Sequence, residues 1–189
     1  MEYFAEKLVD FILKHKVIEE EDYAIYKYGL QTGMETSLCV IVSAFIAVKL
    51  DAFLEYLVFV IMFFPLRAYM GGIHMKRFCS CFLCSCIVIT VGLYLSTQFT
   101  FSGKILVLPI CSLMYINHKL AYVTTKKDSN VEDIEFYALQ RRKIITLLCI
   151  CLLCFLVFHL DQMIVLMLYV LIVLLCAMLI EIILEFYRL

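Results

Sequence analysis

A series of long apolar segments, separated by short polar breaks, constrains what this chain can fold into. Hydrophobic residues occupy 65% of its 189 positions, whereas a typical soluble domain has roughly 45–50%. A soluble fold of this length would bury only about 70% of its surface and would leave much of the apolar excess in water. The chain is therefore predicted to be an integral membrane protein with the lipid bilayer as its surroundings.

Each apolar segment is close to the ~20 residues that a helix needs to cross a bilayer. The second segment has the shortest apolar core, because it contains Glu55 and Pro65, and a re-entrant segment is an alternative there. We expect an all-α fold of about six transmembrane helices, forming a single membrane domain (1–189) with its bundle at 30–185. The predicted spans are 30–48, 52–69, 79–98, 104–122, 144–160 and 163–185.

The N-terminal 1–28 segment is predicted to be amphipathic and to precede the bundle. Phe4, Leu8 and Phe11 recur at helical spacing, with charged residues between them. This pattern is typical of a helix that lies in the membrane interface, and a helix docked on the protein itself is the alternative. A signal peptide is not expected, because the first 22 residues carry too much charge.

The placement of Lys and Arg predicts the orientation of the bundle. With six spans and the N-terminus inside, 14 of the 16 basic residues fall on the inner side, and only Lys49 and Lys104 fall outside. Such a bias marks the cytoplasmic side of a membrane protein. Both termini and two loops, at 66–78 and 123–143, are therefore expected in the cytoplasm. The net charge of −1 gives no reason to expect a nucleic-acid partner.

The residues best suited to chemistry lie between the second and third spans, in RAYMGGIHMKRFCSCFLCSC (67–86). Gly71 and Gly72 release the backbone from helical geometry at a membrane edge. His74 follows them, and Cys81 lies seven residues further on. A thiol must be deprotonated before it attacks a carbonyl, and a neighbouring imidazole is the usual base. The segment therefore suggests a Cys–His pair.

Helical geometry limits how this pair can form. Positions seven apart on one unbroken helix lie about 10.5 Å apart along its axis. His74 can therefore reach Cys81 only if the glycine segment folds back over the third span. Lys76 and Arg77 add positive charge that favours a thiolate. The alternative is that His74 is an interfacial histidine with no catalytic role.

The other cysteines are interpreted as structural. Most of the ten lie in apolar runs, where Cys behaves as a small hydrophobe, so no disulfide framework is predicted. Four of them resemble a zinc ligand set, but a helical rotation of about 100° per residue puts them on opposite sides; they are Cys79, Cys81, Cys84 and Cys86. No metal and no other cofactor is predicted. Cys154 and His159 form a rival pair, but no loop brings them together.

Three acidic residues fall in or beside predicted spans. Glu35 lies within the first span, where an ionisable side chain is costly and is a functional hypothesis by default. It either orients His74 or faces a watery interior. Glu181 and Glu185 are interpreted as capping the cytoplasmic end of the last span.

Arg67, Gly71, Gly72, His74 and Cys81 form the pattern R-x-x-x-G-G-x-H-x₆-C. This pattern strongly resembles that of the AgrB family, the accessory gene regulator protein B of Gram-positive quorum sensing. The similarity covers most of the chain. It includes the amphipathic N-terminus, the YGLQTGMETSL opening of the first span, the basic loop before the fifth span and the total length.

The resemblance implies a multi-pass cysteine endopeptidase of the bacterial cell membrane, with its active site on the cytoplasmic side. Cys81 is then the nucleophile, His74 the general base and Glu35 a third catalytic or orienting group. The implied substrate is an AgrD-like propeptide, which is cut and cyclised to a thiolactone or lactone autoinducing peptide. Because Cys79 and Cys84 flank Cys81, spacing alone selects the nucleophile.

Lys126, Lys127, Arg141 and Arg142 fall in the family's basic loop, where they are expected to hold an acidic propeptide tail. A positive-inside loop accounts for them equally well. The resemblance is also compatible with a homodimer. The alternative function is a non-enzymatic small membrane transporter or peptide-export subunit, and a structural membrane scaffold is a third. The first alternative predicts that Cys81→Ala is tolerated, and the scaffold predicts that neither Cys81 nor Glu35 matters.

Overall fold

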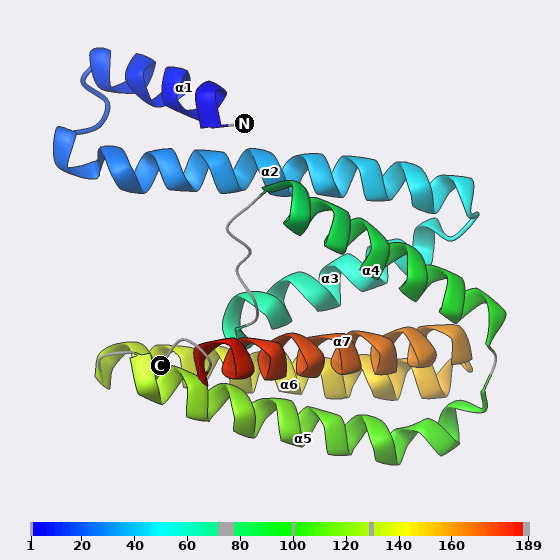
Figure 1. Ribbon diagram of the computed structural model, residues 1–189. Coiled ribbons are helices and arrows are strands. Elements are labelled where there is room, and N and C mark those ends of the chain that lie inside the picture. The colour runs from blue at the N-terminus through cyan, green and yellow to red at the C-terminus, as the bar shows by residue number, and fades with distance from the viewer. Residues whose placement is uncertain (1, 72–77, 100, 129–130, 187–189) are drawn as a thin grey trace.

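The computed structural model describes residues 2–71, 78–99, 101–128 and 131–186, which form a bundle of α-helices (Figure 1). In chain order the elements are α1 (Glu2–Lys14), the 3-10 turn η1 (Glu20–Asp22), α2 (Tyr23–Lys49), α3 (Phe53–Met70), α4 (Phe78–Gln98), α5 (Gly103–Asp128), α6 (Val131–Val157) and α7 (Asp161–Phe186). Each of the six predicted apolar segments corresponds to one of the helices α2 to α7. This confirms the all-α prediction.

Four helical stretches within the described residues are long and apolar enough to cross a membrane. α3 qualifies as one continuous helix despite Pro65, which favours a full span over a re-entrant segment. The described apolar stretch of α4 is shorter, and the apolar part of α6 runs only from Ile144 to Val157, or roughly 21 Å. The four are Glu20–Lys49, Phe53–Met70, Gly103–Val123 and Asp161–Leu184. The molecule is a membrane protein, and the count of six spans stays a prediction.

α7 is the central helix of the bundle and contacts α3, α4, α5 and α6. Its apolar side chains fill the core, and Leu166, Leu171, Leu174 and Met178 are almost completely buried. In Figure 1, α3 and α7 run in the same direction, so their C-terminal ends lie at one end of the bundle. This arrangement brings the residues that follow α3 next to the last turns of α7.

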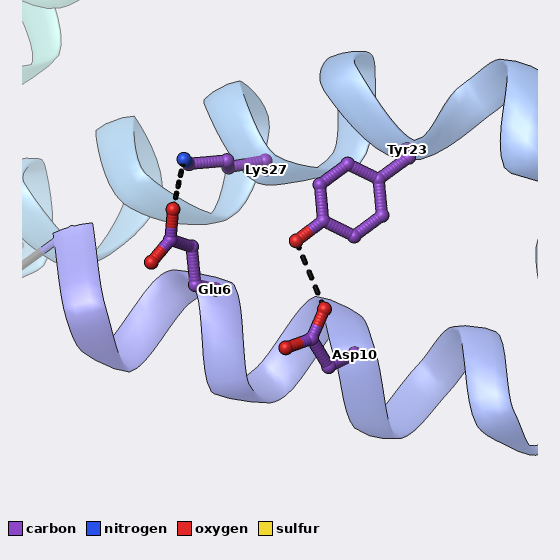
Figure 2. A network of polar contacts seen from close by, with 4 residues as sticks. All are labelled: Glu6, Asp10, Tyr23 and Lys27. Carbon is purple, nitrogen blue, oxygen red and sulfur yellow. Dashed lines mark hydrogen bonds and ion pairs between the residues drawn. The ribbon is translucent and has the colours of Figure 1, made fainter.

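α1 both docks on the protein and keeps an exposed apolar face. Ala5 and Val9 are fully buried, and α1 packs along the N-terminal half of α2. Two polar contacts join these helices (Figure 2): the Glu6 carboxylate pairs with Lys27, and the Tyr23 hydroxyl donates to Asp10 at 2.9 Å. The side chains that remain exposed are Tyr3, Phe4, Leu8 and Phe11. Docking and an interfacial position are therefore compatible, because they use different faces of α1.

The two stretches predicted to be cytoplasmic are partly helical, and their location in the cytoplasm stays a prediction. Within 123–143, α5 continues to Asp128 and α6 begins at Val131, so most of this polar stretch is helical rather than irregular. The 66–78 stretch likewise begins in α3, which ends at Met70. Charged residues indicated where the chain leaves the apolar part of the bundle, but a helix can continue there with polar side chains on all sides.

Candidate active site

Gly71 ends α3 with a backbone conformation that is open only to glycine. Its φ of 92° and ψ of −171° lie in a region that side chains with a Cβ essentially never occupy. The predicted break in helical geometry therefore occurs at Gly71. The predicted site residues that follow lie outside the described residues: Gly72, His74, Lys76 and Arg77.

Cys81 lies in the first turn of α4, which begins at Phe78. In Figure 1, α4 starts beside the middle of α2, and these two helices are in contact. The N-terminus of a helix carries partial positive charge, which favours an anionic group in the first turn. A thiolate is stabilised in such a position, so the backbone around Cys81 suits a nucleophile.

A close contact at Gly92 fixes α4 against α7. The Tyr169 hydroxyl of α7 donates to the Val88 carbonyl at 2.8 Å. A Cβ at Gly92 would lie 2.7 Å from the Tyr169 ring, so a larger residue would push the helices apart. Val88 and Gly92 are seven and eleven residues beyond Cys81 and share its face of α4. The contact therefore fixes the rotation of the helix that carries the predicted nucleophile.

Two further predicted site residues lie on helices that flank this region. Arg67 is half-buried in the last turn of α3, close in sequence to Gly71. Glu35 is half-buried on α2, and its Oε1 accepts a hydrogen bond from Gln31 Nε2 at 3.1 Å. The structure thus places Arg67 at the glycine turn and Glu35 on the helix beside which α4 begins.

Glu181, which is predicted to cap the cytoplasmic end of the last span, lies beside Gly71. Its Oε2 is 3.8 Å from the position that a Cβ would take at Gly71, and its side chain is half-buried. Capping of the cytoplasmic end of the last span stays a prediction for this residue, and a carboxylate near a helix C-terminus opposes the helix dipole. That unfavourable placement was the only feature of the sequence that set Glu181 apart. Its proximity to Gly71 results from the packing of α3 on α7, which brings together residues far apart in the chain.

Two of the four basic residues expected to hold a propeptide, Arg141 and Arg142, differ in exposure. Arg141 is completely buried, and its Nη1 donates to the Ala121 carbonyl of α5 at 2.6 Å. This corrects the prediction for Arg141, which binds a neighbouring helix instead of facing a surface; burial also lowers the pKa of its guanidinium. Arg142 is exposed on α6, whereas Lys126 and Lys127 lie at the end of α5.

The rival Cys–His pair lies at the opposite end of the bundle from Gly71. Cys154 is exposed on α6, and His159 is exposed in the connection between α6 and α7. Among the residues that the structure describes, no group of three or more His, Cys, Asp or Glu side chains is arranged to hold a metal ion.

Comparison with known proteins identifies a family. No curated protein and no solved structure matches the chain. The family model of accessory gene regulator B, AgrB, matches residues 5–183, which is nearly the whole chain. Because the match extends from α1 to α7, the chain belongs to the AgrB family.

Proposed function

We propose that this protein is a membrane-embedded cysteine endopeptidase that cuts an AgrD-like propeptide and promotes its cyclisation. Membership of the AgrB family supports a role in processing the agr quorum-sensing peptide. To this role the proposal adds the chemical reaction and the residues that carry it out. The observation that carries it is the Gly71 turn between α3 and α4, because it ends one helix just before His74 and allows the next to begin just before Cys81.

The chemistry follows from a thiol and a base. His74 accepts the proton of the Cys81 thiol, and the thiolate attacks the carbonyl carbon of the scissile bond. The C–N bond then breaks, and His74 returns the proton to the leaving amine. The products of this step are a free C-terminal fragment and an acyl-enzyme thioester on Cys81.

Cyclisation is a second acyl transfer. A thiol within the bound peptide attacks the thioester, its proton passes through His74 to the Cys81 sulfur, and a thiolactone ring closes. A hydroxyl in place of that thiol would give a lactone. Tethering the attacking thiol to its own acyl group supplies a high effective concentration. A site at the membrane edge limits water, which would otherwise hydrolyse the thioester.

The propeptide's acidic tail is proposed to contact Lys126, Lys127 and Arg142 at the inner ends of α5 and α6. These residues follow or flank the apolar part of the bundle, and Arg142 is exposed. Arg141 is left out because it is buried against α5. A cytoplasmic active site and cytoplasmic termini remain parts of the proposal, supported by the placement of Lys and Arg. A homodimer is also part of it, supported by the resemblance.

Cleavage of a cognate propeptide by the purified protein in lipid vesicles tests the proposal. Wild type should release the acidic C-terminal fragment, and Cys81→Ala should release none. Cys84→Ala is the matched control, because Cys84 is exposed one turn further along α4 and should keep cleavage within about twofold. Cleavage by Cys81→Ala at the wild-type rate would favour the non-enzymatic peptide-export alternative.

A further inference from the structure

We propose that a groove on α2 binds the part of the propeptide that precedes the scissile bond, and that this part docks as an amphipathic helix with a basic end. The inference rests on the proposed function, because it concerns how the substrate of that reaction is held. The α2 groove extends from Ile25 to Ile41 and has a volume of about 840 Å³. Its lining residues within the described structure all belong to α2.

The floor of the α2 groove consists of three small residues spaced four apart, Gly29, Gly33 and Ser37. A Cβ added at either glycine would meet nothing, so the space above the floor is open. Small residues at this spacing allow the backbone of a second helix to come close inside a membrane. The shape of the floor therefore suits a helix as the occupant.

The walls of the α2 groove are apolar. Ile25 and Ile41 are 70% and 66% exposed, and Leu30 is half-buried between them. The hydroxyl of Ser37 donates to the Gly33 carbonyl at 2.8 Å, so this polar group of the floor is satisfied within α2. An apolar groove of this kind is what the apolar face of an amphipathic helix fits.

Acidic residues gather at the end of the groove where α2 begins. Residues 19–22 are four consecutive carboxylates, Glu19 to Asp22, and all are exposed. Lys14 and Lys16 are the exposed cations of the same turn, so residues 14–22 carry a net charge of −2, two cations against four carboxylates. A helix that fills the groove is therefore expected to carry Lys or Arg at this end, because complementary charges orient a partner.

The other end of the α2 groove lies near the proposed active site. In Figure 1, α4 begins beside the middle of α2, and these two helices are in contact. Residues 25–41 extend past that middle and span roughly 24 Å along the helix axis. A propeptide helix in the groove would have its basic end at Glu19–Asp22 and its other end at the level of the first turn of α4. The chain beyond it would lead directly to the scissile bond.

A second copy of the protein suits the α2 groove less well. Two copies in one membrane have the same orientation, so pairing through this groove would make their α2 helices parallel. The two acidic turns, Glu19–Asp22, would then meet, and like charges placed together oppose association. The propeptide has no such conflict when its end at this turn is basic.

Binding of labelled cognate propeptide to Cys81→Ala protein in phosphatidylcholine nanodiscs tests the inference without turnover. Gly33→Leu fills the groove and should raise the Kd at least about tenfold, because it removes the central contact surface. Ala24→Leu is the matched control: Ala24 is exposed and lies nine positions from Gly33, on the opposite side of α2. It should change the Kd by less than about twofold.

A charge swap tests the basic end and does not depend on how Gly33→Leu folds. Changing Glu20, Glu21 and Asp22 together to Lys should raise the Kd roughly 5- to 50-fold, as expected for losing three exposed ion pairs. Changing the Lys and Arg residues upstream of the scissile bond to Glu should do the same. The two changes combined should restore the Kd to within about threefold of wild type, which a folding defect cannot do.

The inference is wrong if Gly33→Leu folds and binds like wild type, or if the charge swap gives no rescue. It is also wrong if a photoreactive benzoylphenylalanine at position 33 crosslinks only to lipid or to a second copy. The proposed function fails separately, when Cys81→Ala still forms the acyl-enzyme. A Cys81-dependent acyl-enzyme together with unchanged binding by Gly33→Leu would refute the groove alone.

Discussion

At Gly71 the chain takes a conformation that only glycine tolerates, and the proposed site depends on this residue. Its φ of 92° turns the backbone out of α3, and the Glu181 carboxylate lies beside it. Gly29 offers a contrast, because it lies inside α2 with open space where its Cβ would be. The same substitution should therefore have opposite effects at the two positions.

Gly71→Ala should lower the free energy of unfolding by about 1–3 kcal/mol, the usual cost of forcing a residue with a Cβ into a strained backbone region. It should also slow acyl-enzyme formation, because the turn precedes His74. Gly29→Ala should be neutral or stabilising by up to about 1 kcal/mol, since alanine is the better helix former. Unfolding by SDS titration in mixed micelles measures both, and equal effects at the two glycines would contradict this account.

Single residues also show how far sequence reasoning extends. The turn at Gly71 was predictable, because glycine at the end of an apolar run indicates a turn. The burial of Arg141 was not predictable, because a run of basic residues usually indicates a solvated surface. The hydrogen-bond acceptor of Arg141, the Ala121 carbonyl, lies on another helix. The proximity of Glu181 to Gly71 was not predictable for a similar reason: the two residues lie more than 100 positions apart in the chain.

At the scale of elements, α4 matters most, because it carries Cys81 and is positioned by α7. Tyr169 fills the space above Gly92 and hydrogen-bonds the Val88 carbonyl. The sequence predicted α4 as an apolar helix but could not predict its rotation. That rotation is set by a contact between one small and one large residue on different helices.

Gly92→Ala should destabilise the fold by about 1–3 kcal/mol, because a new methyl group would meet the Tyr169 ring at a well-packed contact. Gly33→Ala is the matched control, since an added Cβ there meets nothing. Combining Gly92→Ala with Tyr169→Ala should cost less than the sum of the two single changes. Additive losses in SDS unfolding titrations would show that this contact is not what fixes α4.

At the scale of the whole molecule, the two ends of the bundle differ in the residues that meet there. The Gly103 N–H donates to Asp161 Oδ1 at 2.9 Å, which joins the N-termini of α5 and α7 at one end. Gly71 and Glu181 lie at the other end. All six predicted segments became helices, because apolar runs of this length have few other solutions in a membrane. The packing of these helices on α7 could not be predicted, since it depends on side-chain fit.

Labelling with a membrane-impermeant maleimide tests the proposed orientation. Phe101→Cys and Phe158→Cys change exposed residues near the Gly103–Asp161 end and should react in intact cells. Glu135→Cys, exposed on the first part of α6, should react only after the cells are opened. Peptide mapping identifies the labelled position despite the native cysteines. Labelling of Glu135→Cys from outside would contradict the cytoplasmic location of the site.

The central claim is that Cys81 carries the acyl group of the propeptide, and trapping that intermediate tests it most directly. Purified protein in lipid is mixed with cognate propeptide and quenched in acid within one turnover, and intact mass followed by peptide mapping locates the adduct. The account predicts an alkali-labile thioester on Cys81, its absence in Cys81→Ala, and its formation roughly 10²–10⁴-fold more slowly in His74→Ala. A thioester on Cys79 or Cys84, or one that persists in Cys81→Ala, would contradict it.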